Sequence, residues 1–79
     1  MRKIIEGQVY RHFKGHMYKV LCIGKDSETL KEVVIYRNID TNEVWVRPLD
    51  MFSSLVDKNK YPEVKQKYRF ELVDDIQRI

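Results

Sequence analysis

The chain has 79 residues, of which 43% are hydrophobic and 34% are charged, and this balance fits one globular domain near the lower size limit for a single core. Its net charge of +3 is uneven: residues 1–25 carry six basic and one acidic side chain, and residues 26–56 carry three basic and six acidic ones. The acidic middle weakens the electrostatic field of the basic first third. The charge distribution therefore gives only weak support for binding to nucleic acid.

The sequence contains no run that approaches the roughly 20 apolar residues of a membrane span. Cys22 is the single cysteine and has no partner for an internal disulfide. The apolar stretch that follows the basic residues at the start of the sequence is interrupted at Glu6, before it reaches the length of a signal peptide. We therefore expect one soluble domain over residues 1–79, with its core within residues 7–73, in a reducing cytoplasm and without a membrane partner.

The first two predicted strands form a hairpin. Residues 8–13 alternate with period two, and residues 18–23 are rich in β-forming side chains. Between them, Lys14 and Gly15 form a turn in which glycine supplies the positive φ that such connections often need. The two strands should pair antiparallel.

A polar loop and a second hairpin follow. Residues 24–32 contain Asp26, Ser27 and Thr29, which are turn-stabilising residue types. Residues 33–37 include a β-branched run, and residues 43–47 alternate again beyond a turn at residues 38–42. Pro48 should end this fourth strand because proline has no N–H for the ladder.

The last elements are a short helix and a fifth strand. Apolar residues in 49–56 have helical spacing, and Tyr68, Phe70 and Leu72 alternate with charged residues. The prediction is an all-β, small five-stranded SH3-like barrel with one short helical turn between strands four and five. An open antiparallel sheet capped by the helix is the alternative. Closure is preferred because it removes exposed edges.

The alternation also predicts which side chains are buried. Tyr10 and His12 should lie opposite the core face, in a groove, while Cys22 should be buried in its strand, and Phe52 should plug one end of the barrel. The predicted core consists of Val9, Phe13, Val20, Val34, Tyr36, Val46, Phe52, Phe70 and Leu72.

Several motifs, taken in order, resemble a known family. They are Gly7-x-Val-Tyr10-x-His12-x-Lys14-Gly15-x-x-Tyr18-x-Val20, Ser27-Glu28-Thr29, Val34-x-Tyr36, Trp45-Val-Arg-Pro48, Phe52 and Arg69-Phe70. Together they resemble the small bacterial domain-of-unknown-function family 1653 over residues 7–73. The chain departs from that pattern at Gly24, where alanine is usual, and at Asp26, where histidine is expected. The resemblance implies a compact β domain and no particular reaction.

The candidate site lies where the first hairpin, the 26–29 loop and the end of the fourth strand are expected to converge. In this hypothesis Arg47 holds the Glu28 carboxylate, and hydroxyl and imidazole groups supply further hydrogen bonds. A structural ion pair between Arg47 and Glu28 is the alternative. The predicted binding residues are Tyr10, His12, Lys14, Ser27, Glu28, Thr29, Trp45 and Arg47.

These residue types favour a small cytoplasmic binding module, whose candidate partners are nucleic acid, a peptide or a small anionic ligand. One alternative is a hydrolase-like enzyme that acts through His12 and the Asp26-Ser27-Glu28 loop, although no nucleophile motif surrounds Ser27. Another alternative is a weak nucleic-acid-binding domain. His12 and His16 lack the spacing of a zinc motif, so no metal and no cofactor are predicted.

Overall fold

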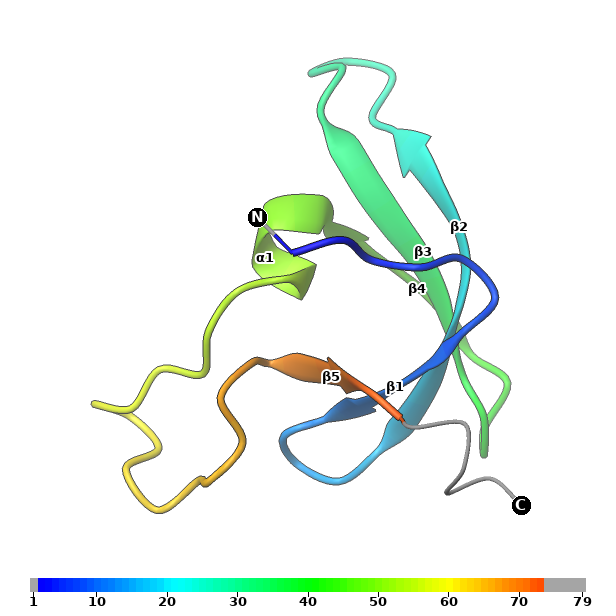
Figure 1. The fold of residues 1–79 in the computed structure, drawn as a ribbon. Helices are drawn as coiled ribbons and strands as arrows, with labels where there is room; N and C mark the ends of the chain where they lie inside the picture. The colour runs from blue at the N-terminus through cyan, green and yellow to red at the C-terminus, as the bar shows by residue number, and fades with distance from the viewer. Residues whose placement is uncertain (1, 74–79) are drawn as a thin grey trace.

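Five strands and one short helix make up the fold in the computed structural model, which describes residues 2–73 (Figure 1). The elements are β1 (Val9–His12), β2 (Met17–Lys25), β3 (Glu32–Asn38), β4 (Val44–Pro48), α1 (Leu49–Phe52) and β5 (Phe70–Leu72). All five predicted strands are therefore confirmed. The helix is shorter than the predicted 49–56 segment.

The strands form one antiparallel sheet in the order β4-β3-β2-β1-β5. Tyr10 of β1 lies opposite Tyr18 of β2, Val20 of β2 lies opposite Tyr36 of β3, and Tyr36 lies opposite Trp45 of β4. Directly opposed residues point to the same face of a sheet, so these side chains share one face. That face carries the core.

The sheet is open, so the predicted SH3-like barrel is not confirmed. Among the described residues, β4 pairs with β3 and β5 pairs with β1, and no pairing joins β4 to β5. Figure 1 shows the sheet curling around α1 rather than closing. Helix packing and short edges thus replace closure, as in the alternative of a capped open sheet.

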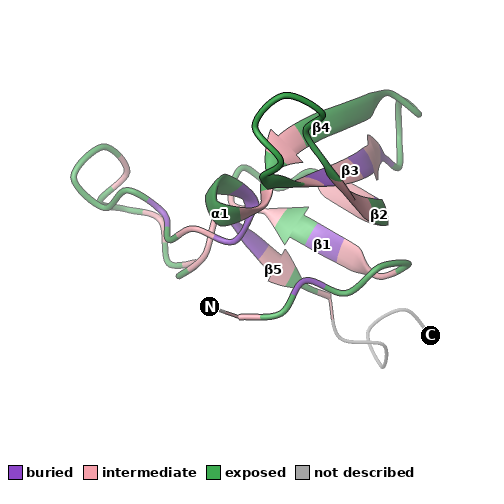
Figure 2. Cartoon of the chain, turned by 90° about the horizontal axis from the view of Figure 1, so that it is seen from above, coloured by how far each residue is buried: buried purple, intermediate pink, exposed green. Residues whose placement is uncertain are grey.

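Aromatic rings pack on the inner face of the sheet around Phe52. The Phe52 ring stacks on Phe70, with centroids 4.0 Å apart, and meets Tyr36 and Tyr10 edge-on at 5.2 and 5.6 Å. Figure 2 shows buried segments on α1, β1, β3 and β5. Phe52 is fully buried, which confirms its predicted position in the core.

The predicted core is confirmed at Val20, Val34, Tyr36, Phe52 and Phe70, which are all buried. The faces of β1, however, are inverted relative to the prediction. Tyr10 is 1% exposed, whereas Val9 and Phe13 are only half-buried. A strand has period two, so choosing the wrong face misplaces every side chain along it.

Two further core predictions were wrong, at Val46 of β4 and Leu72 of β5, which are both exposed. Val46 lies opposite Ile35, on the face away from the core, whereas Leu72 lies opposite Tyr10 on a strand that has a neighbour on one side only in the described structure. Cys22 is also exposed rather than buried. It lies opposite Ile35, on the face away from the core.

Helix α1 ends after one turn because the following serines bond back to it. The hydroxyl of Ser53 donates to Leu49 O at 2.9 Å, and that of Ser54 donates to Met51 O. No helix within residues 2–73 has the length and apolar character needed to cross a membrane. The cytoplasmic location stays a prediction.

Candidate functional site

A pocket of about 330 Å³ opens between the β1–β2 turn, the end of β4 and the segment that leads to β5. We call it the basic pocket. It is lined by His12, Phe13, Lys14, Arg47, Asp57, Lys60, Tyr61 and Arg69.

Cations dominate the basic pocket. Two arginines and two lysines line it, whereas Asp57 is the one carboxylate among these lining residues. An Asp57 oxygen already accepts hydrogen bonds from the backbone N–H groups of Asn59 and Lys60, at 3.0 and 3.3 Å. Asp57 therefore stabilises its own turn, and the pocket keeps an excess of positive charge.

Both arginines are held through Nε. Arg47 Nε donates to the Tyr36 hydroxyl at 3.2 Å, and Arg69 Nε donates to the Ser54 hydroxyl at 3.3 Å. The Arg47 guanidinium also lies 5.9 Å from the centre of the Phe70 ring. Fixing Nε orients a guanidinium plane, and the two terminal nitrogens are those that bind an anion as a fork.

His12 lies half-buried against aromatic rings. It stacks on Phe13, with ring centres 4.4 Å apart, and meets the edge of Phe70 at 4.9 Å. Burial, followed by the charges of Arg47, Arg69, Lys14 and His16, lowers the pKa of His12 to about 4. The imidazole is thus neutral at pH 7. Its Nδ1 accepts the Lys14 N–H at 3.1 Å, which leaves Nε2 as the N–H donor.

Tyr61 and Phe13 form an aromatic wall of the basic pocket. Their ring centres are 4.9 Å apart, and the rings are tilted by 56°. The ammonium groups of Lys14 and Lys60 lie 5.7 and 5.5 Å from the centre of the Tyr61 ring. Aromatic surface and positive charge therefore occur together in this part of the pocket.

Three of the predicted binding residues, His12, Lys14 and Arg47, come together in this pocket. Tyr10 shares the face of His12, but the prediction that it lies exposed in a groove is wrong, since its ring is buried and its hydroxyl accepts the N–H of Ile5 at 2.9 Å. Trp45 lies on β4, half exposed, outside the lining of the pocket. Whether these residues bind a ligand stays a prediction.

The predicted Ser27, Glu28 and Thr29 lie elsewhere, at the tip of the β2–β3 hairpin. The β1–β2 turn precedes β2 and the β2–β3 turn follows it, so the nine residues of β2 separate them, and Figure 1 shows them at opposite ends of the sheet. The predicted convergence with His12 is therefore wrong, and none of the three loop residues joins the lining that His12 shares with Arg47. Among the hydrogen bonds of the described residues, none assembles a Ser27–His12 dyad or joins Arg47 to Glu28.

Turn chemistry occupies the polar groups of that hairpin tip. One Asp26 oxygen accepts the N–H groups of Glu28 and Thr29, at 2.8 and 3.2 Å. These bonds lower the pKa of Asp26. The Thr29 hydroxyl accepts the N–H of Lys31 at 3.2 Å. The side-chain oxygens of Asp26 and Thr29 therefore stabilise backbone.

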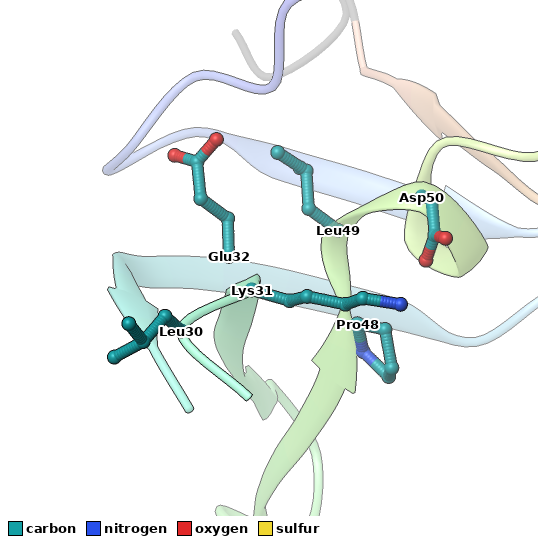
Figure 3. A pocket seen from close by; sticks show the side chains of 6 residues that line it. All are labelled: Leu30, Lys31, Glu32, Pro48, Leu49 and Asp50. Carbon is teal, nitrogen blue, oxygen red and sulfur yellow. The ribbon is translucent and has the colours of Figure 1, made fainter. Parts of the chain in front are cut away.

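A second pocket, of about 350 Å³, lies between this turn and the junction of β4 with α1 (Figure 3). Leu30, Pro48 and Leu49 supply apolar walls, and Lys31 faces a lining that also contains Glu32 and Asp50. With two carboxylates and one ammonium group, this lining does not favour an anionic ligand. The basic pocket is therefore the stronger candidate.

A third pocket, of about 590 Å³, is formed by the N-terminal segment with β2, β3 and α1. The Arg2 guanidinium in its lining donates to the carbonyls of Ser53 and Phe70 and lies 4.1 Å from the centre of the Tyr68 ring. Burial lowers the pKa of Arg2. Arg2 thus fastens the N-terminal segment to the core and has a structural role.

Five residues that line the basic pocket were not predicted as binding residues: Phe13, Asp57, Lys60, Tyr61 and Arg69. Three of them lie in the charged 57–67 segment, which has no periodic pattern to place it against the sheet. The Arg69-Phe70 motif, at the start of the predicted fifth strand, was the one sequence feature that could have indicated Arg69 as a member of the site. Within residues 2–73, no group of three or more His, Cys, Asp or Glu side chains could hold a metal ion.

Comparisons with known proteins give one match. No curated protein matches the chain, and no solved structure does. The model of the family described as "protein of unknown function (DUF1653)" matches residues 8–72, a range that includes the sheet and the basic pocket. Since this match covers most of the sequence, the chain belongs to that family.

Proposed function

We propose that this domain is a binding module that holds a small anionic ligand in the basic pocket. The observation that carries the proposal is the gathering of Arg47, Arg69, Lys14 and Lys60 around one cavity whose carboxylate is already engaged. Pockets of this size suit small ligands.

Hydrogen-bonding capacity points to an oxyanion with several acceptor atoms. Arginine and lysine side chains donate only, and His12 presents Nε2–H while it is neutral. A phosphate group accepts many such bonds and pairs with arginine in a forked geometry. Inorganic pyrophosphate is therefore a suitable probe of the pocket.

Binding is preferred to catalysis because the pocket lacks an activated nucleophile. Ser27 lies at the far end of β2, and the lowered pKa of His12 makes it a poor general base near neutral pH. His12 instead supplies a donor of fixed orientation.

A specific observation favours a second function, weak binding of single-stranded nucleic acid. Lys14 and Lys60 flank the Tyr61 ring, and an aromatic ring beside cations is a common platform for a base and its phosphate. Such binding would use the same pocket and would be electrostatic. An affinity for an oligonucleotide that stayed tight at high salt would contradict it.

The test is a calorimetric titration of pyrophosphate at about 20 and about 200 mM salt, with wild type and two variants. Arg69→Gln removes a charged donor from the pocket and should weaken binding by about tenfold, as loss of a hydrogen bond to a charged group does. Arg37→Gln is the control. Arg37 lies opposite Lys19 on the outer face, and its guanidinium donates to Asn42 at 2.7 Å.

The expected result is binding that weakens with salt and with Arg69→Gln and not with Arg37→Gln. Absence of pyrophosphate binding by the wild type would overturn the proposal. So would equal losses in the two variants, because the effect would then reflect net charge rather than this pocket.

A further inference from the structure

Strand β4 presents an exposed apolar edge of the sheet. In the described residues it pairs with β3 alone. Its three consecutive residues Val44, Trp45 and Val46 are 56%, 49% and 63% exposed. The opposite edge is formed by β5, which is only three residues long and carries Glu71 at its centre. A short, charged edge resists pairing, so β4 is the edge that is open to another strand.

The backbone of β4 can accept such a strand. Asn38 N donates to Glu43 O at 2.9 Å, so the Glu43 carbonyl points toward β3. Peptide groups alternate along an antiparallel strand, and those of Val44 and Val46 therefore point to the free edge. Pro48, which has no N–H to offer, lies at the end of the strand.

The side chains of β4 are self-complementary. The run Glu43-Val44-Trp45-Val46-Arg47 reads the same in both directions about Trp45, except that its ends have opposite charge. In an antiparallel pair centred on Trp45, each valine opposes a valine and each glutamate opposes an arginine. Opposite charges and aromatic pairs across strands are favourable.

We propose that β4 pairs antiparallel with β4 of a second copy of this chain, about a twofold axis at Trp45, so that two sheets become one. The outward peptide groups of Val44 and Val46 then bond reciprocally across the axis. Symmetry places a Glu43 backbone position opposite an Arg47 position twice, so the two opposite charges attract across the axis while Arg47 keeps its Nε hydrogen bond to the Tyr36 hydroxyl. This charge pattern fixes the register and explains why the occupant is a second copy rather than an unrelated peptide.

The outer face of the sheet extends this contact. Val46 lies opposite Ile35, and Ile35 lies opposite Cys22, so a strip of apolar side chains crosses β4, β3 and β2 away from the core. Val44 of the partner subunit would continue that strip beyond β4. The contact area of one short strand is small, so the dimer should be weak and dependent on concentration.

Trp45 reports directly on this contact because it is the single tryptophan of the chain. Sedimentation analysis from about 5 µM to about 1 mM should show a monomer that converts to a dimer. Over the same range the fluorescence emission of Trp45 should shift to shorter wavelength, since the ring leaves water as the strands pair. A change in mass without a change in emission would place the contact elsewhere and overturn the proposal.

Two variants of exposed side chains test the register without disturbing the core. Glu43→Arg places like charges opposite each other, and Val44→Lys puts charges beside the axis, so each should shift the midpoint of dimer formation to at least about tenfold higher concentration. Glu28→Arg, the same charge reversal at the tip of the β2–β3 hairpin, is the control and should leave the midpoint unchanged. Unaltered dimerisation in both β4 variants, or a wild-type monomer at about 1 mM, would overturn the proposal.

Discussion

The β1–β2 turn, which borders the basic pocket, and the β2–β3 turn lie at opposite ends of β2, and both regions concentrate polar side chains. In the turn, Asp26 and Thr29 use their oxygens to accept backbone N–H groups two or three residues away. In the pocket, the side-chain hydrogen bonds that hold Arg47 and Arg69 to other described residues use Nε. Polar density therefore indicates a binding site only where the polar atoms are not already used by the local backbone.

The β3–β4 turn shows that this use of polar atoms is a repeated structural solution. Asn38 Oδ1 accepts the N–H groups of Asp40 and Thr41, as Asp26 does at the equivalent place in the β2–β3 turn. Each turn also places a residue with positive φ before its last position, Leu30 at 62° and Asn42 at 64°. Turn geometry thus accounts for Asp26 and Thr29 in the Asp26-Ser27-Glu28-Thr29 cluster.

The largest expected effect is the loss of stability caused by Phe52→Ala. This substitution should disturb the basic pocket and leave the β2–β3 turn unchanged. Phe52→Ala removes the ring that stacks on Phe70, and Phe70 in turn contacts His12 and Arg47. A large-to-small substitution at a fully buried site should cost about 3–5 kcal/mol, measured by urea denaturation.

Amide hydrogen exchange, measured on the folded Phe52→Ala variant, would then distinguish the effect on the basic pocket from that on the β2–β3 turn. We expect faster exchange for amides of β1 and β5, which pack near Phe52, and little change for the amides that bond to Asp26. A cost below a few tenths of a kcal/mol would contradict the central place of Phe52 in the core.

Local sequence signals were enough to predict all five strands, both hairpins and the burial of Phe52, because each depends on period-two alternation, turn residues or helical spacing. The faces of β1 could not be fixed this way. Tyr10 and Val9 both suit a buried position, and the choice depends on the Tyr10 hydroxyl finding the Ile5 N–H. Such a partner is visible only in three dimensions.

A smaller effect is expected when the turn oxygens are removed. Asn38→Ala deletes a buried acceptor of two backbone N–H groups and should cost about 1–2 kcal/mol by thermal or urea denaturation. Asp26→Ala removes the same pair of bonds at a fully exposed site, and water can replace them there, so its cost should be lower. Pyrophosphate binding should not change in either variant; a change with Asp26→Ala would show that the turn and the pocket are coupled.

Acid should affect the two regions in different pH ranges. The folded-state pKa of His12 is lowered from 6.5 to about 4, so the unfolded chain takes up this proton first. Its contribution to stability is complete above pH 6.5 and is lost as the pH falls toward 4. The pKa of Asp26 is lowered from 3.8, so its contribution is complete above that value and is lost only in stronger acid.

NMR titration of the His12 ring should show its midpoint near pH 4, and saturating pyrophosphate should raise it because an anion stabilises the imidazolium. The Asp26 midpoint should not respond to pyrophosphate. A His12 midpoint near its ordinary value of 6.5 would mean that the ring is neither buried nor close to the arginines.

The members of the candidate site were only partly predictable. His12 and Lys14 adjoin one turn, and their proximity follows from sequence separation. Arg47, Tyr61 and Arg69 reach the same pocket from a distant strand and from loops, and their positions depend on how the sheet curls around Phe52. No pattern within a single segment encodes that curvature.

The smallest effect on stability is expected at the residues with positive φ in the β2–β3 and β3–β4 turns. Leu30 and Asn42 have nearly the same φ, but asparagine tolerates the left-handed region better than leucine because its short polar side chain can hydrogen-bond the local backbone. Leu30→Asn should therefore stabilise the protein by about 0.5–1 kcal/mol, and Asn42→Leu should destabilise it by a similar amount, as shifts of the urea midpoint without a change in slope. Leu30 is 70% exposed, so little packing is lost on replacement. If Leu30→Asn instead lowers stability, the Leu30 side chain contributes more through its contacts with Pro48 and Leu49 around the second pocket than its backbone strain costs.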